Sequence, residues 1–254
     1  MNLQKGDLNG SPLFLFQVNI CIDIGNTRTK VGYFEHGRLL NVQRIPAAER
    51  LFDFIRIAEN DRIIISSVVK TTEELKSLFK NYPSVLFLNS ESRLPIKNNY
   101  ASPKTLGYDR IAAAVGATVH FSGENILIID IGTAVKYDFV NSENAFEGGI
   151  ISPGKRMRFK ALNTFTQKLP LLDSEDIPEL IGDDTESCMK SGVMNGLLAE
   201  INGIIEEYQK KVNFQIITTG GDAPYFESRI KYPTFAAPNL VLEGLNRILE
   251  YNVI

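Results

Sequence analysis

The chain has 254 residues, of which 44% are hydrophobic and 22% are charged, and its formal net charge is −3. This composition is typical of a globular protein with enough apolar material for one large core or two smaller ones. The slightly acidic balance leaves no broad basic surface, which argues against nucleic acid as the main partner.

The reactive side chains that many enzymes use are scarce in this sequence. Cys21 and Cys188 have no second cysteine or histidine at metal-ligand spacing, so we expect both to be buried small hydrophobic residues. His36 and His120 are interpreted as structural or surface residues, and any catalysis would therefore rest on carboxylates. No apolar run reaches the length of a membrane span and no signal peptide is recognised, so we expect a cytoplasmic protein.

The first half of the chain alternates short apolar strands with helices. Residues 1–17 form an extension ahead of the first expected strand. Pro46 can open a helix, and Thr71 with Glu74 makes a Ser/Thr-x-x-Glu capping box. In order, we expect strands at 18–24, 31–34 and 38–42, a helix after Pro46 carrying Leu51, Phe54, Ile55 and Ala58, a strand at 62–67, a helix after Thr71, a strand at 85–88 and a loop over 89–106.

The second half repeats this order of elements. An alanine-rich helix opened by Asp109 ends the first half. In order, we then expect a strand at 126–129, a hairpin through 137–140, a glycine-rich stretch at 148–154, a helix over 155–167, an acidic loop over 169–184, a helix over 185–211, a strand at 214–219 and a last amphipathic helix carrying Leu242, Leu245 and Leu249. The repeat predicts a duplicated α/β unit, with one lobe at 18–122 and the other at 123–254.

An Asp-Ile-Gly turn ends a strand in each half, at Asp23-Ile24-Gly25-Asn26-Thr27 and at Asp130-Ile131-Gly132-Thr133-Ala134. Glycine lets a phosphate approach the backbone, and threonine and asparagine can donate hydrogen bonds to its oxygens. An aspartate at the strand end can hold a hard cation such as Mg²⁺. The pattern favours two phosphate-binding turns, although two ordinary hairpins with glycine turns would also produce it.

A second informative stretch, Gly107-Tyr108-Asp109-Arg110, lies at the expected start of a helix. Asp109 can accept a proton from a hydroxyl group that attacks a phosphoryl centre, and Arg110 can bind a carboxylate with two parallel hydrogen bonds. The alternative is an aspartate placed favourably at a helix N-terminus with a solvated arginine beside it.

The order and spacing of several motifs are shared with one family. These motifs are Asp23 to Thr27, Leu106 to Arg110, Asp130 to Ala134, Gly148 to Gly154, Leu169-Pro170, Thr185 with Ser191-Gly192, and Thr219 to Ala223. Through them the chain resembles the type III pantothenate kinases, of the acetate kinase, sugar kinase, Hsp70 and actin superfamily. The resemblance implies an α/β fold of two ribonuclease-H-like lobes, each a mixed sheet with flanking helices. It also implies ATP-dependent phosphorylation of pantothenate to 4'-phosphopantothenate, the first step of coenzyme A biosynthesis.

The resemblance further implies a role for each matching position. Asp109 would be the general base on the pantothenate hydroxyl. ATP would be bound by Asp23, Ile24, Gly25, Asn26, Thr27, Arg28, Thr29, Lys30 and Thr133. Pantothenate would be bound by Tyr100, Gly107, Tyr108, Asp109, Arg110 and Thr185. Asp23 would hold Mg²⁺, Asp130 would hold a monovalent cation (K⁺ or NH₄⁺), and two chains would form a homodimer with the substrate site across the interface.

Lys136 departs from the family's pattern, because the position three residues after Thr133 usually carries a hydroxyl group. Its ammonium group could lie near a phosphate or point to solvent, and it puts the need for a monovalent cation in question. Two other functions remain open on the same fold: a non-enzymatic homologue that assists transcription, and a sister kinase for another small molecule. The Gly107–Arg110 stretch distinguishes a pantothenate kinase from such a sister kinase, because sugar kinases do not share that arrangement.

Overall fold

The computed structural model describes residues 5–6, 12–13, 17–46, 48–82 and 84–252. It divides into two compact units, one formed by Met1–His120 with Asn239–Ile254 and the other by Phe121–Pro238. The expected extension at 1–17 lies largely outside the described residues, and within it Lys5–Gly6 (β1) pairs antiparallel with Pro12–Leu13 (β2). None of the described helices combines the length and the apolar character that crossing a membrane requires.

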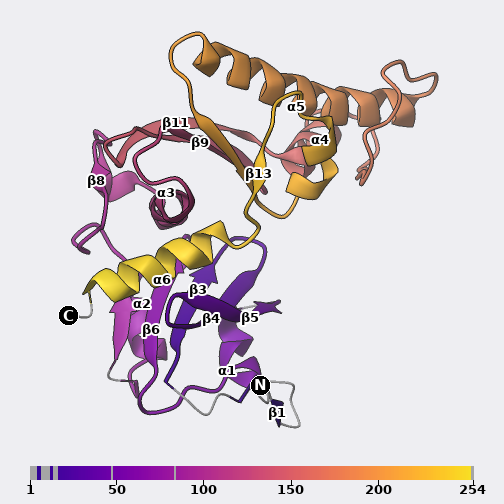
Figure 1. Cartoon of the computed structure of the whole chain (residues 1–254). Coiled ribbons are helices and arrows are strands. Elements are labelled where there is room, and N and C mark those ends of the chain that lie inside the picture. Colours follow the sequence, from indigo (N-terminus) through magenta and orange to yellow (C-terminus); the bar gives the residue numbers. More distant parts are fainter. Residues whose placement is uncertain (1–4, 7–11, 14–16, 47, 83, 253–254) are drawn as a thin grey trace. The chain divides into compact units, whose positions relative to one another are not determined.

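The first unit is built on a five-stranded mixed sheet (Figure 1). Its strands are β3 (Asn19–Ile24), β4 (Thr29–Glu35), β5 (Arg38–Ile45), β6 (Arg62–Ser67) and β7 (Val85–Phe87). Its helices are α1 (Leu51–Phe54), α2 (Thr72–Leu78), α3 (Tyr108–His120) and α6 (Leu240–Asn252), with the short strand β8 (Lys97–Asn98) and the 3-10 turns η1 (Ala48–Arg50) and η2 (Pro103–Thr105). The strand order is β5-β4-β3-β6-β7, with β3, β6 and β7 parallel and the β3–β4 and β4–β5 pairs antiparallel.

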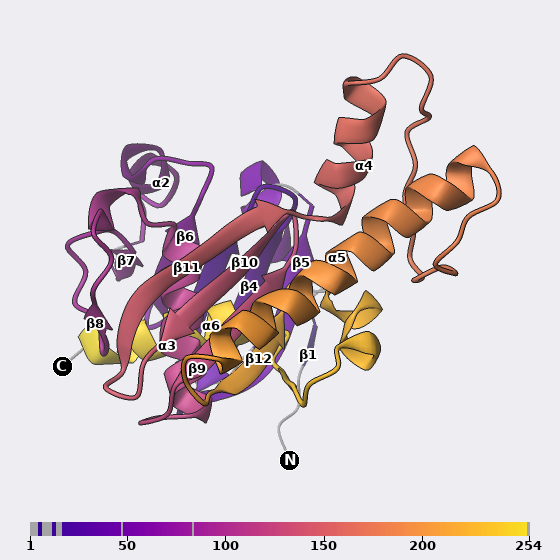
Figure 2. The ribbon, with the colours of Figure 1, turned by 90° about the horizontal axis from the view of Figure 1, so that it is seen from above.

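The second unit also contains a mixed sheet, which α5 crosses in Figure 2. Its strands are β9 (Ile126–Ile131), β10 (Ala134–Val140), β11 (Ala145–Pro153), β12 (Gln215–Thr219) and β13 (Phe235–Ala236). Its helices are α4 (Lys155–Thr164) and α5 (Thr185–Gln209), with the 3-10 turns η3 (Ala223–Tyr225) and η4 (Glu227–Arg229). These strands follow one another in the order β13-β12-β9-β10-β11.

The two sheets have the same connectivity. In order and direction, β3 to β7 correspond to β9 to β13: an antiparallel three-stranded meander, then two parallel strands added beside its first strand. The duplicated mixed sheet with flanking helices that the sequence predicts is therefore confirmed. In each copy the aspartate of the Asp-Ile-Gly turn lies opposite a lysine on the returning strand, Asp23 opposite Lys30 and Asp130 opposite Lys136.

Each sheet buries alternate side chains against helices. In the first unit, the isoleucines of β3 at 20, 22 and 24 share a core with Leu51 of α1 and Leu75 of α2. In the second unit, Leu197 and Ile201 of α5 pack on the apolar side chains of β9. Period-two alternation in the strands and 3.6-residue periodicity in the helices produce these apolar faces, which burial then stabilises.

The last helix, α6, packs in the first unit although the chain reaches it only after the second. It contacts α3, β3 and β6 (Figure 1). A Cβ on Gly244 would lie 1.8 Å from the carbonyl oxygen of Ala112 on α3, so the two helices touch backbone to backbone. Asn19 of β3 also donates a hydrogen bond to the side-chain oxygen of Asn246 at 2.9 Å. This grouping differs from the expected second lobe at 123–254, because the apolar stripe of α6 is buried against the first sheet.

The helix expected to carry Leu51 to Ala58 is shorter than its apolar spacing indicates. It ends at Phe54, and Ile55 is extended with φ −111° and ψ 149°. The carboxylate of Asp61 accepts the backbone N–H of Ala58 at 2.8 Å and that of Val18 at 3.1 Å. This side chain offers the backbone an alternative to helical hydrogen bonds, so the chain leaves the helix one turn early.

The two cysteines differ in their surroundings. Cys21 of β3 is buried, as expected, and burial raises the pKa of its thiol well above the ordinary value. Cys188 in the first turn of α5 is exposed, so the expectation that both are buried is wrong for Cys188.

Candidate functional site

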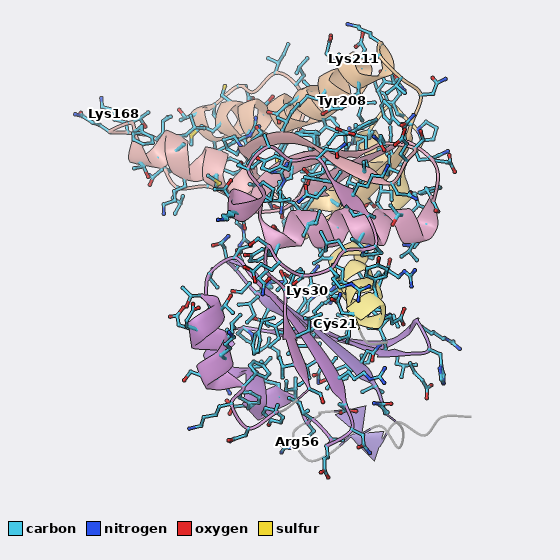
Figure 3. The ribbon with its side chains drawn as sticks, turned by 90° about the vertical axis from the view of Figure 1, so that its left-hand side faces the viewer. Cys21, Lys30, Arg56, Lys168, Tyr208 and Lys211 are labelled. Atoms are coloured by element: carbon cyan, nitrogen blue, oxygen red, sulfur yellow. The ribbon has the colours of Figure 1, made fainter. Side chains whose placement is uncertain are left out.

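The first Asp-Ile-Gly turn closes the β3–β4 hairpin. Gly25 donates its N–H to the carbonyl oxygen of Arg28 at 3.2 Å, and residues 26–28 are exposed. Asp23 and Lys30 are half-buried and face each other across the hairpin. Figure 3 shows Lys30 at one end of the first unit and Arg56 at the opposite end. The hairpin end therefore presents exposed donors beside a carboxylate, as phosphate and metal binding require.

A buried hydroxyl group adjoins this turn. Ser66 of β6 is the register partner of Asp23, and its Oγ is buried and has no hydrogen-bond partner in the part of the chain that the structure describes. The Oγ of the next residue, Ser67, accepts the N–H groups of Val69 at 3.2 Å and Lys70 at 2.8 Å. A buried polar atom without a partner carries a free-energy cost, so Ser66 marks a polar position beside Asp23 that sequence reasoning missed.

The Gly107-Tyr108-Asp109-Arg110 stretch begins α3. The N–H of Arg110 donates to the carbonyl oxygen of Gly107 at 3.1 Å and to Oδ1 of Asp109 at 2.9 Å. Asp109 and Tyr108 are half-buried, whereas Arg110 is only 5% exposed. The Cζ atom of Arg110 lies 5.5 Å from the ring centroid of Tyr100. The structure thus brings together Tyr100 and Arg110, which the sequence assigns to one substrate site.

The second Asp-Ile-Gly turn closes the β9–β10 hairpin of the second unit. Gly132 donates its N–H to the carbonyl oxygen of Ala134 at 3.1 Å, and Gly154 donates to that of Thr133 at 3.1 Å. Thr133 itself is exposed. The turn is therefore held by backbone hydrogen bonds while its hydroxyl residue faces outward.

Asp130 and Lys136 form an ion pair at the base of this turn. The Nζ atom of Lys136 lies 2.6 Å from Oδ2 of Asp130, and the side chains are 16% and 17% exposed, respectively. The sequence leaves two placements open for Lys136, solvent and a phosphate neighbourhood, and the structure shows its ammonium group paired with Asp130 at the base of the second Asp-Ile-Gly turn.

The turn after β12 packs against the same aspartate. Gly220 has a positive φ of 99°, and a Cβ at this position would lie 2.5 Å from Oδ1 of Asp130. Asp222 donates its N–H to the carbonyl oxygen of Ile131 at 2.9 Å. The Gly-Gly-Asp motif at 220–222 is thus fixed against the end of β9, which explains why only glycine fits at position 220.

A buried lysine joins α4 to two acidic segments. Lys155 is 1% exposed, and its Nζ donates to the carbonyl oxygen of Ser174 at 2.7 Å and lies 3.1 Å from Oδ1 of Asp173. It is 3.9 Å from Oδ1 of Asp222 and 4.3 Å from the ring centroid of Tyr225. Burial alone would raise the pKa of Asp173, but hydrogen bonds from Lys155 and the N–H of Ser174 hold that pKa below its ordinary value. The sequence assigns no role to Lys155, although it follows the glycine motif that ends at Gly154.

A half-buried polar cluster fixes α5 on the sheet. Glu200 of α5 accepts hydrogen bonds from Tyr137 Oη at 2.9 Å and Ser152 Oγ at 3.0 Å, and it forms an ion pair with Arg158. Burial, and then the charge of Glu200, raise the pKa of Tyr137. No sequence pattern singles out Glu200, because one glutamate within a helix resembles any other.

Thr185 is the first residue of α5 and is exposed. Asp184 caps this helix by accepting the N–H of Ser187 at 2.7 Å. Hydrogen bonds from Ser187 lower the pKa of the Asp184 carboxyl group. The candidate site residues therefore occur in both units: Asp23, Lys30 and 107–110 in the first, and Asp130, Thr133 and Thr185 in the second.

Known sequences resemble this chain over most of its length. The sequence profile of the type III pantothenate kinase family matches residues 19–207. A type III pantothenate kinase of Cytophaga hutchinsonii is 46% identical over 240 residues, which cover 93% of this chain and 100% of that protein. One of Christiangramia forsetii is 41% identical, covering 92% of this chain and 99% of the relative.

Solved structures share the fold at low sequence identity. A Campylobacter jejuni protein described as a Baf family transcriptional activator has a TM-score of 0.60 and 22% identity, covering 92% of this chain and 98% of that one. MreB5 of Spiroplasma citri bound to AMPPNP has a TM-score of 0.53 and 14% identity, covering 93% of this chain and 97% of that one. These likenesses show the actin-like and Hsp70-like fold that the sequence predicts, and at such identities they show the fold alone.

Proposed function

Because the chain belongs to the type III pantothenate kinase family, we propose that its residues 107–110 present pantothenate to ATP, with Asp109 as the general base. The protein phosphorylates pantothenate to 4'-phosphopantothenate, the first step of coenzyme A biosynthesis, and uses ATP and a divalent metal ion. The observation that carries the assignment of roles is the start of α3, where a half-buried carboxylate adjoins a buried guanidinium group over an aromatic ring.

The first turn is the proposed site of the ATP phosphates and Mg²⁺. In the described part of the chain, no three His, Cys, Asp or Glu side chains gather into a cluster that could hold a metal ion. Mg²⁺ in kinases is usually held by one or two carboxylates together with phosphate oxygens and water, and Asp23 supplies such a carboxylate. The exposed stretch at 26–28 and Lys30 would contact the phosphate oxygens, and Thr133 would do so from the second turn.

Phosphoryl transfer places few chemical demands on this chain. When bound, Mg²⁺ neutralises phosphate charge. Asp109 accepts the proton of the pantothenate hydroxyl group as its oxygen attacks the γ-phosphorus, and ADP leaves. Arg110 fixes the acceptor by binding its carboxylate, and the ring of Tyr100 holds the guanidinium group in place. Orientation and charge neutralisation thus account for the reaction without a covalent intermediate.

We expect Arg110→Lys to raise the KM for pantothenate about 10- to 100-fold while the KM for ATP stays nearly unchanged. A lysine keeps the charge but loses the two-pronged geometry that matches a carboxylate. Steady-state kinetics with pantothenate, and inhibition by its alcohol analogue pantothenol, measure this effect. The variant should discriminate less between the two compounds.

Arg93→Lys is a matched control, because Arg93 also lies over an aromatic ring, 5.3 Å from the centroid of Tyr251. Its kinetics should equal those of the unmodified chain. Equal KM values for pantothenate in the Arg110 and Arg93 variants would contradict the assignment of Arg110 to the carboxylate.

The proposed homodimer would bring Thr185 to the substrate of a second copy. Supporting it, Thr185 is exposed and follows Leu180 and Ile181, which are 75% and 87% exposed. Exposed apolar side chains beside a candidate site residue are typical of an interface.

We expect sedimentation equilibrium of the unmodified chain to give twice the 28.4 kDa of one chain, and the Ile181→Asp variant to give the mass of one chain. Val119→Asp, at an exposed position on α3, should stay dimeric; monomers in all three samples would refute the dimer.

A further inference from the structure

The ion pair at the second turn carries an inference that rests on the proposed function. We propose that the ammonium group of Lys136 supplies the positive charge at this turn and that the enzyme needs no monovalent cation there. Lys136 would then act as a positioning residue for the nucleotide phosphates, acting through Asp130 and the Gly132-Thr133 backbone.

The residues present do not fit a monovalent cation at Asp130. Oδ2 of Asp130 already has the Nζ of Lys136 at 2.6 Å. Oδ1 faces the backbone of Gly220, where even one added carbon would lie at 2.5 Å. A cation entering beside Oδ2 would meet the like charge of the ammonium group, which repels it. Oδ2 is therefore paired with the protein's own ammonium group, and the space beside Oδ1 is taken up by backbone.

The backbone register holds the ammonium group where it is. Lys136 and Asp130 are directly opposite in the antiparallel β9–β10 pair, where facing side chains lie close together. Their side chains are mostly shielded from solvent, at 16% and 17% exposed, so water and salt screen the pair less than a surface pair. The charge is thus fixed before any ligand binds, and no ion has to be recruited from solution.

A phosphate site needs this charge. An unpaired carboxylate at the base of the Gly132-Thr133 turn would repel a phosphate, whereas the neutralised pair leaves the backbone N–H groups and Thr133 to attract it. The first turn shares the register, because Asp23 lies opposite Lys30 in the β3–β4 pair, but there Lys30 is assigned to the phosphate oxygens and Asp23 to Mg²⁺. A lysine opposite the turn aspartate is therefore a feature of both halves of the chain.

The test compares cations at constant ionic strength in protein freed of K⁺. The dissociation constant of AMPPNP, measured by calorimetry, and the rate of pantothenate phosphorylation are determined in N-methylglucamine, Na⁺, K⁺ and NH₄⁺ chlorides. For the unmodified chain, we expect the dissociation constant and the rate to differ by less than about twofold between the four salts. An ion that the enzyme requires would change them about tenfold, which corresponds to about 1.4 kcal/mol. A tenfold improvement in K⁺ or NH₄⁺ would overturn the proposal.

Two variants separate the charge from the fold. Lys136→Ser should bind AMPPNP about tenfold more weakly in N-methylglucamine and recover in K⁺ or NH₄⁺, whereas Lys136→Arg should remain indifferent to the cation. Lys160→Ser, at an exposed position of α4, controls for loss of a positive charge. A Lys136→Ser variant that binds as the unmodified chain does in every salt would also overturn the proposal. Absence of pantothenate turnover in all salts would count against the proposed function, while nucleotide binding would still decide the role of Lys136.

Discussion

Asp109→Asn is expected to lower kcat for pantothenate phosphorylation by about 10²- to 10⁴-fold, the usual contribution of a general base. Asparagine has the same shape and can still accept the N–H of Arg110 that Oδ1 of Asp109 accepts at 2.9 Å. It cannot take a proton from the attacking hydroxyl group. The loss should therefore appear in kcat, while AMPPNP affinity and the melting temperature stay close to those of the unmodified chain.

Asp53→Asn is the matched control for this result. Asp53 lies in the same unit, on α1, and its carboxylate pairs with Arg50 at 3.0 Å with both side chains 60% exposed. An exposed pair of this kind contributes little to stability, so neither activity nor stability should change measurably. Turnover of Asp109→Asn within about threefold of the control would remove Asp109 as the general base.

Gly244→Ala is expected to destabilise the first unit by about 3 kcal/mol or more, the upper part of the range for overpacking. A Cβ at position 244 would lie 1.8 Å from the carbonyl oxygen of Ala112 and 2.8 Å from the backbone nitrogen of Gly116. Both atoms belong to backbone in α3, so no side chain can move aside and the helices must separate. Because Asp109 and Arg110 lie on α3, activity should fall together with stability.

Urea unfolding followed by circular dichroism measures this effect, and Gly203→Ala is its control. Gly203 is exposed within α5, and a Cβ there would meet no atom within 4 Å. Alanine favours the helix over glycine, so this control should stabilise the protein by about 0.5–1 kcal/mol. If both variants were equally stable, the backbone contact between α3 and α6 would not exist in solution.

The sequence was sufficient to predict the repeated order of strands and helices. Apolar alternation and the two Asp-Ile-Gly turns give the strands, and Thr71 with Glu74 gives a helix start. The structure shows that capping box, with the N–H of Thr71 donating to Glu74 at 2.7 Å and that of Glu74 donating to Thr71 at 3.3 Å. These features depend on neighbours along the chain, which a sequence displays directly.

The position of α6 could not be predicted in the same way. The stripe of Leu242, Leu245 and Leu249 shows that one face of the helix is apolar, but not which sheet buries it. The small residues of α3 likewise predict close packing without naming a partner. The early end of α1 depends on Asp61, whose hydrogen bonds with the backbone of Ala58 and Val18 cannot be read from the helical spacing.

The candidate site also contains residues that the sequence could place and residues that depend on tertiary contacts. The sequence places Asp23, Asp109 and Asp130 at strand or helix ends, and the structure places them there. The contact between Lys136 and Asp130 required the hairpin register, since a shift of one residue would turn Lys136 to the other face. Lys155 and Glu200 required tertiary packing, because their partners lie in other segments of the second unit.

The most direct test of the central claim is an ADP-release assay with the purified chain, Mg²⁺ and ATP, in which pantothenate is compared with acetate, hexoses and no acceptor. The product is examined by phosphorus NMR for a new phosphomonoester. We predict ADP release and one new phosphomonoester with pantothenate alone, and loss of both signals with Asp109→Asn. Equal ADP release without an acceptor, or a phosphorylated hexose in place of phosphopantothenate, would contradict the assignment of pantothenate kinase activity.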